Sequence, residues 1–378
     1  MNPYFDAAIA QLLERTRQLH ELIPRHLGRD VAPLEVITHD RLQFLGHRLK
    51  VLRDAPELQR PENQRERLRI FRRLCADLDQ LESIAVSVLC RWNQEDQRLN
   101  RLAGGLASEI RFPLPTPVVA CISQGYYETH AGLRLIRVPL AEGRFLLHLP
   151  DLYHELAHSL LEFDNDARLA SFQAAHVAAV EDAYRYLAGE LQKERSGLGP
   201  DIFKRYLTTW THCWMSWAIE FFCDLFALYM VGPAFAWAHL HLSATAAEPP
   251  FSVPSFTTAA HPADAARMRV LVFALDRLGF RDQAEAVSRC WERLLQLGGY
   301  RRTPEYLRCF PDSLLRRIEE QAYNGTVGLG CDCASPTMAG AGRKTLNEAW
   351  EVLWQSPKEY VDWERGAVAN LATKFFSQ

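Results

Sequence analysis

Apolar residues recur every three or four positions along most of this chain, which is the spacing of an amphipathic helix. In the first hundred residues the pattern runs from Leu68 to Trp92 and predicts one long helix. The same spacing predicts further helices over residues 166–193, 202–231, 262–278, 281–297, 311–323 and 345–376. We therefore expect helices to form most of the protein.

The pattern changes between Pro113 and Pro150. Short apolar runs over residues 118–122, 133–138 and 145–149 are separated by turns that contain glycine, and such runs are typical of strands. The predicted fold class is mainly α (α+β) with one small sheet. We expect a helical N-terminal region (1–107), a core (108–280) and a C-terminal helical region (281–378).

Two long loops interrupt the predicted helices. Residues 243–260 contain three prolines, and we expect this loop to border a cleft. Residues 324–343 are rich in glycine and are expected to be mobile.

The candidate chemistry starts at residues 154–158, which read His-Glu-Leu-Ala-His within a predicted buried helix. Residues four apart lie one above the other on a helix, so His154 and His158 can bind one ion. Catalytic zinc sites use such imidazole ligands and keep one position for water. Glu155 points about 100° away and would take a proton from that water. The alternative is an ordinary amphipathic helix with two core histidines.

A third ligand is available on the predicted helix 202–231. Glu220 and Asp224 share one face of it, in a stretch that is otherwise strongly apolar. Buried carboxylates need a compensating partner, and a metal ion supplies one. Glu220 would complete the ligand set, while Asp224 would orient a ligand imidazole. The alternative is that both carboxylates face solvent or pair with arginine or lysine.

The order of these segments resembles the gluzincin zinc metallopeptidases. The His-Glu-x-x-His run is followed by Glu-x-x-x-Asp at 220–224 and by His-Pro-x-x-x-x-Arg from His261 to Arg267. Within the gluzincins, it most resembles the group of the heat-shock membrane protease and the prenyl-protein protease. The resemblance covers roughly residues 148–269, about a third of the chain.

The resemblance implies a zincin-like core that holds one Zn²⁺ through His154, His158 and Glu220. It also implies that Glu155 is the general base and acid and that Asp224 hydrogen-bonds a ligand histidine, most simply His154. The same resemblance places His261 and Arg267 near the oxyanion or against Glu220, although His261 can equally be a loop residue before a helix.

Two further features qualify this resemblance. The turn Gly232-Pro233 is shorter than in the family, and Cys223 stands where a small residue is common.

In such cores an edge strand binds the substrate peptide through main-chain hydrogen bonds. We assign that strand to residues 133–138.

Composition bears on partners and location. The chain has 378 residues, a net charge of −3 and nine cysteines. Acids at 62, 66, 77 and 79 lie among or after the arginines at 65, 67, 69, 72 and 73, so we expect a solvated helix face and no nucleic-acid partner. The longest apolar run, residues 225–238, is only about 14 residues, too short to cross a membrane. With no N-terminal signal, we expect a cytoplasmic protein with reduced cysteines.

Cys331 and Cys333 lie in the glycine-rich loop. Such a pair could bind metal, or one thiolate could occupy the open zinc position and hold an enzyme latent.

The sequence thus predicts a zinc-dependent endopeptidase of a protein or peptide substrate, whose helical flanks restrict access or dock a regulatory protein. The alternatives are a zinc hydrolase of a small amide or ester, and a catalytically silent interaction module.

Overall fold

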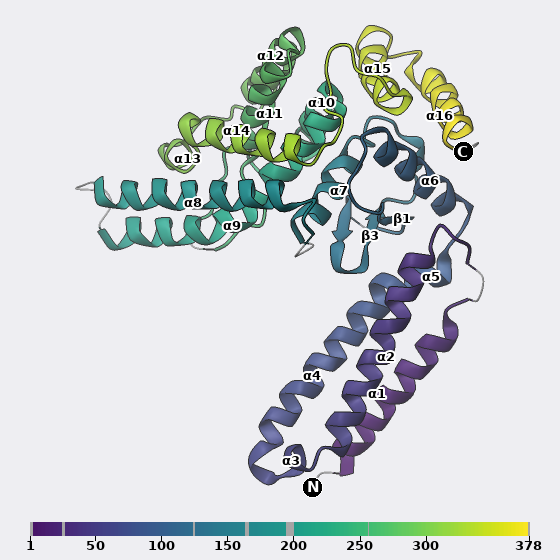
Figure 1. Ribbon diagram of the computed structural model, residues 1–378. Coiled ribbons are helices and arrows are strands. Elements are labelled where there is room, and N and C mark those ends of the chain that lie inside the picture. The colour runs from purple at the N-terminus through teal and green to yellow at the C-terminus, as the bar shows by residue number, and fades with distance from the viewer. Residues whose placement is uncertain are drawn as a thin grey trace. The chain divides into compact units, whose positions relative to one another are not determined.

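The computed structural model describes residues 3–24, 27–123, 125–162, 166–193, 200–255 and 257–376. Helices make up most of these residues, and three short strands form one sheet (Figure 1). The predicted fold class, mainly α with a small sheet, is confirmed. The chain forms two compact units: Met1–Arg101 with Pro117–Leu140, and Leu102–Thr116 with Ala141–Gln378. We call them unit 1 and unit 2. They do not coincide with the three predicted segments.

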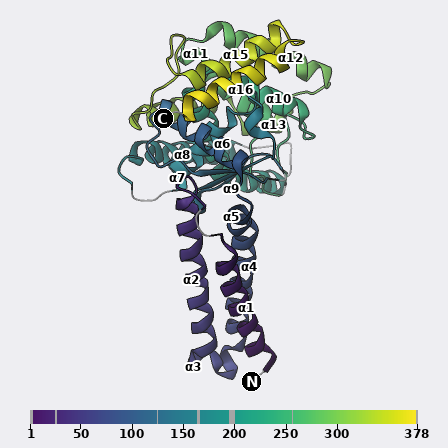
Figure 2. The same ribbon diagram turned by 90° about the vertical axis from the view of Figure 1, so that its right-hand side faces the viewer.

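Unit 1 contains a helical bundle. Helices α1 (Pro3–Leu22), α2 (Ala32–Asp54) and α4 (Gln64–Leu81) pack side by side around buried leucines (Figures 1 and 2). Helix α4 continues through a π-helical turn (Glu82–Val86) into α5 (Ser87–Arg91), so the predicted long helix is present. Two short helices, α3 (Pro56–Gln59) and the 3₁₀ turn Pro61–Asn63, connect α2 to α4. Helix α6 (Gln94–Glu109) follows α5 and ends in unit 2.

The sheet belongs to unit 1 and has the order β1-β3-β2. Strand β1 (Val118–Cys121) pairs in parallel with β3 (Leu135–Val138), and β2 (Glu128–His130) pairs with β3 antiparallel. The assignment of residues 133–138 to a peptide-binding edge is therefore wrong, because β3 is the central strand. Strand β2 is short and half-buried, so its alternation gave no clear signal in the sequence.

The third predicted strand, residues 145–149, is also wrong. Residues 146–149 form turns. The His148 carbonyl accepts a hydrogen bond from the Asp151 N–H, and the Leu149 carbonyl accepts one from the Leu152 N–H. The backbone N–H of Leu146 donates to the carboxylate of Glu364 instead of to a neighbouring strand. An apolar run by itself does not distinguish a strand from a buried turn.

Unit 2 is built around helix α9 (Pro200–Val231), which packs against α7, α8, α11 and α14. The helices of this unit after α6 are α7 (Asp151–Glu162), α8 (Ala170–Lys193), α9, α10 (Pro233–Thr245), α11 (Asp264–Arg277), α12 (Arg281–Leu297), α13 (Pro304–Cys309), α14 (Asp312–Gly328), α15 (Ala341–Gln355) and α16 (Tyr360–Phe376). The predicted helices from 166 to 323 are present with shifted ends.

The predicted helix 345–376 is two helices, α15 and α16. Ser356 precedes a proline and adopts φ −140° and ψ 62°, which a helix does not allow. Helix α10 was not predicted, since it follows α9 after a single residue. Gly232 makes this break with φ 79°, a conformation that favours glycine.

Helix α9 is longer than the apolar run that the sequence analysis considered for membrane crossing. Its segment Lys204–Val231, 28 residues long, is apolar enough to span a bilayer by length and composition. In the structure 83% of its most apolar window is buried inside the protein, as in the core helix of a soluble protein.

The glycine-rich loop after α14 is held by main-chain hydrogen bonds. Asp332 N–H donates to the Ile110 carbonyl, and Ala334 N–H donates to the Tyr229 carbonyl at the end of α9. The expectation of a mobile segment therefore does not fit its backbone contacts.

Candidate metal centre

Helix α7 places three polar side chains in the interior of unit 2. Its leucines at 152, 156 and 160 are buried, and so are His154 and Glu155. His158, one turn after His154, is partly exposed, and the two imidazole centroids lie 5.1 Å apart. The apolar stripe thus draws the polar pair into the core, where each group needs a partner.

Helix α9 supplies those partners from one turn. Glu220 directs Oε2 to within 3.5 Å of His154 Nε2 and Oε1 to within 3.9 Å of His158 Nε2. Asp224, one turn later, is fully buried and lies 2.9 Å from His154 Nδ1. The two nitrogens of His154 therefore have separate partners, with Nδ1 against Asp224 and Nε2 against Glu220.

Arg267 on α11 fixes Asp224 from the other side. Its Nε and Nη2 donate to the two carboxylate oxygens at 2.7 and 2.6 Å. Burial works against the charge on Asp224, but the Arg267 guanidinium and the His154 hydrogen bond outweigh it and hold the pKa of this carboxyl well below its usual range. A bidentate arginine and carboxylate pair has little freedom to rotate. Arg267 thereby fixes the orientation of the His154 ring.

The imidazoles respond in opposite directions to this environment. Burial disfavours the charge on His154, yet its hydrogen bonds to Asp224 and Glu220 raise its pKa to about 10. Burial and the charge of His154 lower the pKa of His158 to about 4. For Glu220, burial is outweighed by the His154 hydrogen bond and charge, which lower its pKa to about 2. The two carboxylates thus favour a charged His154, and its charge favours a neutral His158.

The spacing of the possible donor atoms can be compared with that of a metal site. Ligands on the vertices of a zinc tetrahedron lie roughly 3.3–3.6 Å apart. The distances of 3.5 and 3.9 Å from Glu220 to the two Nε2 atoms are close to this spacing. One donor atom each from His154, His158 and Cys223 also lie within 4.8 Å of one another. This buried His-His-Cys group could bind a metal ion.

The structure brings all of the candidate residues to one place. His261, in the segment before α11, has an exposed imidazole with Nε2 3.7 Å from Glu220 Oε2. Arg267 hydrogen-bonds Asp224 and acts on Glu220 only through its charge. Glu155 is buried on α7, and its charge acts on the thiol of Cys223 together with those of Glu220 and Asp224.

Sequence reasoning treated Cys223 only as a departure from the family. It lies three residues after Glu220, so helical geometry puts both side chains on one face, and this spacing could have shown it. A thiolate from Cys331 or Cys333 was the one expected to reach the centre, but Cys331 hydrogen-bonds the Arg111 carbonyl, and neither thiol belongs to the His154, His158 and Cys223 group. Burial raises the pKa of Cys331 to about 12, and burial with the nearby carboxylates also raises the pKa of Cys223, so position and not pKa distinguishes the two thiols.

The chain was compared with protein-family models, with curated proteins and with solved structures, and none of them matches it.

Proposed function

We propose that this protein is a zinc-dependent endopeptidase, with His154, His158 and Glu220 as metal ligands. One observation carries the proposal: Asp224 occupies Nδ1 of His154, so that Nε2 faces Glu220 and the neighbouring His158. A buried imidazole held through one nitrogen, with the other directed at a carboxylate and a second imidazole, is the arrangement that metal-ligating histidines adopt.

Glu155 would carry the proton transfers. Bound zinc polarises a carbonyl and lowers the pKa of its water to about 7. Glu155 follows His154 directly on α7 and is buried with it, where its carboxylate can accept a proton from the attacking water and return it to the leaving amine. Neither a buried core helix nor a metal-storage site requires a carboxylate at this position.

His261 and Arg267 would have different tasks. The exposed imidazole of His261 can donate to the substrate carbonyl oxygen as negative charge develops on it. Arg267 has both of its donating nitrogens on Asp224, so it is a positioning residue that acts through His154.

A protein substrate is proposed from the resemblance to the gluzincins, and a cytoplasmic location from the sequence. The helices outside the centre would dock a regulatory protein or limit access. Removal of residues 1–107 would not test this cleanly. Asp96 accepts a hydrogen bond from the Cys121 N–H, and Asn100 accepts one from the Val119 N–H. The truncation would therefore also remove two hydrogen-bond acceptors of strand β1. Comparing cleavage of casein-type proteins with that of small amides, using the full chain, tests the substrate class.

A second candidate is a non-catalytic metal-binding module. Cys223 favours it, because a fourth protein donor can take the place of the catalytic water. Peptidase activity of the full chain, measured for the wild type and for Glu155→Gln, separates the two candidate functions. An endopeptidase loses its turnover in the variant, whereas a non-catalytic module has none in either protein.

The first experiment is the zinc content per chain, measured by plasma mass spectrometry on protein purified without chelator or added metal. We expect about one zinc per chain in the wild type, much less in Glu220→Ala, and an unchanged amount in Glu155→Gln. Folding of each variant is checked by circular dichroism. A well-folded wild type without bound metal, and unable to bind added zinc, would refute the proposal.

A further inference from the structure

Cys223 occupies an unusual position for a cysteine. Its side chain is fully buried, and among the described residues its thiol makes no hydrogen bond. It lies within 4.8 Å of a ring nitrogen of both His154 and His158. Buried free thiols commonly sit among apolar side chains as small hydrophobes, but this one faces two metal-ligating groups.

The backbone keeps the thiol there. Cys223 is in the interior of α9, three residues after Glu220 and next to Asp224. Helix α9 packs against α7, which carries the histidines, so neither the thiol nor the imidazoles are on a mobile segment. Sγ can change position mainly by rotation about its single side-chain torsion, which moves it by about 3 Å between staggered rotamers.

We propose that Cys223 supplies a thiolate ligand to the metal ion held by His154 and His158. With Glu220, the centre then has four protein donors, two nitrogens, one oxygen and one sulfur. This inference rests only on the metal-binding part of the proposed function. A shell filled by four protein donors leaves no position for the catalytic water, so the inference favours the second candidate, the metal-binding module.

Binding forms one sulfur–metal bond and breaks the S–H bond, and the proton leaves to solvent. No electron is transferred, and the only partner required is a divalent cation. Thiolate is a soft ligand, so the centre would select Zn²⁺ or Co²⁺ over the hard ions Mg²⁺ and Ca²⁺. Four protein donors also fill a tetrahedral shell, so that water would enter only when one donor withdraws.

Cobalt gives a direct test, since a thiolate bound to Co²⁺ produces a charge-transfer absorption that imidazole and carboxylate ligands do not. The full chain is stripped of metal and titrated with Co²⁺ alone. The near-ultraviolet spectrum and the amount of cobalt bound are then recorded for the wild type and for Cys223→Ala, Cys223→Ser and Cys309→Ala. Cys309 is the matched control, since it is equally buried but lies on α13.

We expect one cobalt per chain with a thiolate band in the wild type and in Cys309→Ala. Both Cys223 variants should still bind cobalt, at least tenfold more weakly, and lack the band. Cobalt bound by the wild type without a thiolate band, or with a band that survives in Cys223→Ser, would overturn the inference while leaving the proposed function intact. A wild type that binds no cobalt would overturn both.

Discussion

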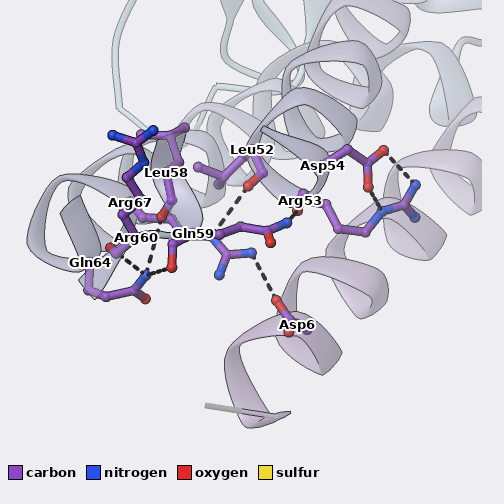
Figure 3. A network of polar contacts seen from close by, with 9 residues as sticks. All are labelled: Asp6, Leu52, Arg53, Asp54, Leu58, Gln59, Arg60, Gln64 and Arg67. Atoms are coloured by element: carbon purple, nitrogen blue, oxygen red, sulfur yellow. Dashed lines mark hydrogen bonds and ion pairs between the residues drawn. The ribbon is translucent and has the colours of Figure 1, made fainter. Parts of the chain in front are cut away.

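Two arginines, one in each unit, show how similar ion pairs can have different consequences. Arg67 in the α4 helix of unit 1 is fully buried and donates to Asp6 at 2.8 Å and to the Leu52 carbonyl at 3.3 Å (Figure 3). Its guanidinium also lies over the Phe5 ring. These contacts join α4 to α1 and α2. The Arg267 pair in unit 2 is equally close, but its carboxylate continues to the imidazole of His154.

The difference lies in the carboxylate. Asp6 has a side chain that is 49% exposed, whereas that of Asp224 is completely buried. Water can solvate Asp6, so the Arg67 pair requires nothing further. Asp224 must be fully satisfied by protein groups, and one of these is a histidine whose other nitrogen faces a second carboxylate. A buried arginine therefore indicates function only when its contacts lead to such a group.

The largest effect on activity is expected at Glu155, which belongs to neither of these two arginine–aspartate pairs. Glu155→Gln preserves the shape of the side chain but removes the proton acceptor, so peptidase turnover should fall by about 10²–10⁴-fold. Zinc content and the free energy of unfolding should stay within experimental error of the wild type. Steady-state kinetics on a protein substrate, with zinc measured on the same samples, would check this. Equal activity in the variant would exclude the proposed mechanism.

Removing the buried carboxylate should be costly for stability. Asp224→Ala leaves the Arg267 guanidinium buried without its partner, and breaking such a pair costs about 3–5 kcal/mol. It also frees the His154 ring, so zinc affinity should fall by about 10–100-fold. Urea unfolding of the metal-free protein and a competitive zinc titration measure the two effects. Wild-type zinc affinity in a folded Asp224→Ala would show that the Asp224 contact does not orient a ligand.

The contribution of His176, a histidine on α8, is predicted to depend on pH. His176 packs edge-on against Phe222 with its Nε2 unpartnered among the described residues, and burial lowers its pKa to about 4. Between this value and the unfolded pKa near 6.5 the unfolded chain binds more protons. The stabilisation is therefore complete above pH 6.5 and is lost as the pH falls to 4, by about 3 kcal/mol.

The variant His176→Leu isolates this contribution. Urea unfolding of both proteins at pH 7 and pH 4.5 should show that the wild type loses at least 2 kcal/mol more than His176→Leu, roughly as the linkage relation gives. Parallel losses in the two proteins would mean that His176 is solvated or partnered in solution.

The smallest effect is expected at the exposed carboxylate. Asp6→Ala removes the carboxylate partner of Arg67, just as Asp224→Ala does for Arg267. Arg67 is fully buried but keeps the Leu52 carbonyl, and water can replace a carboxylate that is already half exposed, so the cost should be smaller, about 1–2 kcal/mol. Zinc content should be unchanged. If this variant lost as much stability as Asp224→Ala, burial of the carboxylate would not be what distinguishes the two pairs.

The sequence was most informative where one element contains the whole pattern. The helical period predicted α8, α9, α11 and α12, and the spacing from His154 to His158 and from Glu220 to Asp224 placed each pair on one helix face. It was less informative where partners are far apart in the chain. The central position of β3 depends on pairing with two other strands, and the partner of Arg267 depends on how α9 packs against α11.

Other differences have local causes. Residues 145–149 are apolar because they are buried, and their backbone groups are satisfied by turns and by the distant Glu364. Cys223 was judged against a family pattern, although its spacing from Glu220 already placed both side chains on one face of α9. That this face lies against the two imidazoles follows from the packing of α7 on α9.

The single turn of α9 that holds Glu220, Cys223 and Asp224 makes the centre vulnerable to one kind of genetic change. Each residue of a helix turns the chain by about 100°. Inserting or deleting one codon between the buried Trp214 and Glu220 would therefore rotate all three side chains away from α7 together, while leaving the composition of the helix almost unchanged. Over evolutionary time the centre could be lost in one step. It could be regained only by a second insertion or deletion that returns the three side chains to the face of α9 that packs on α7.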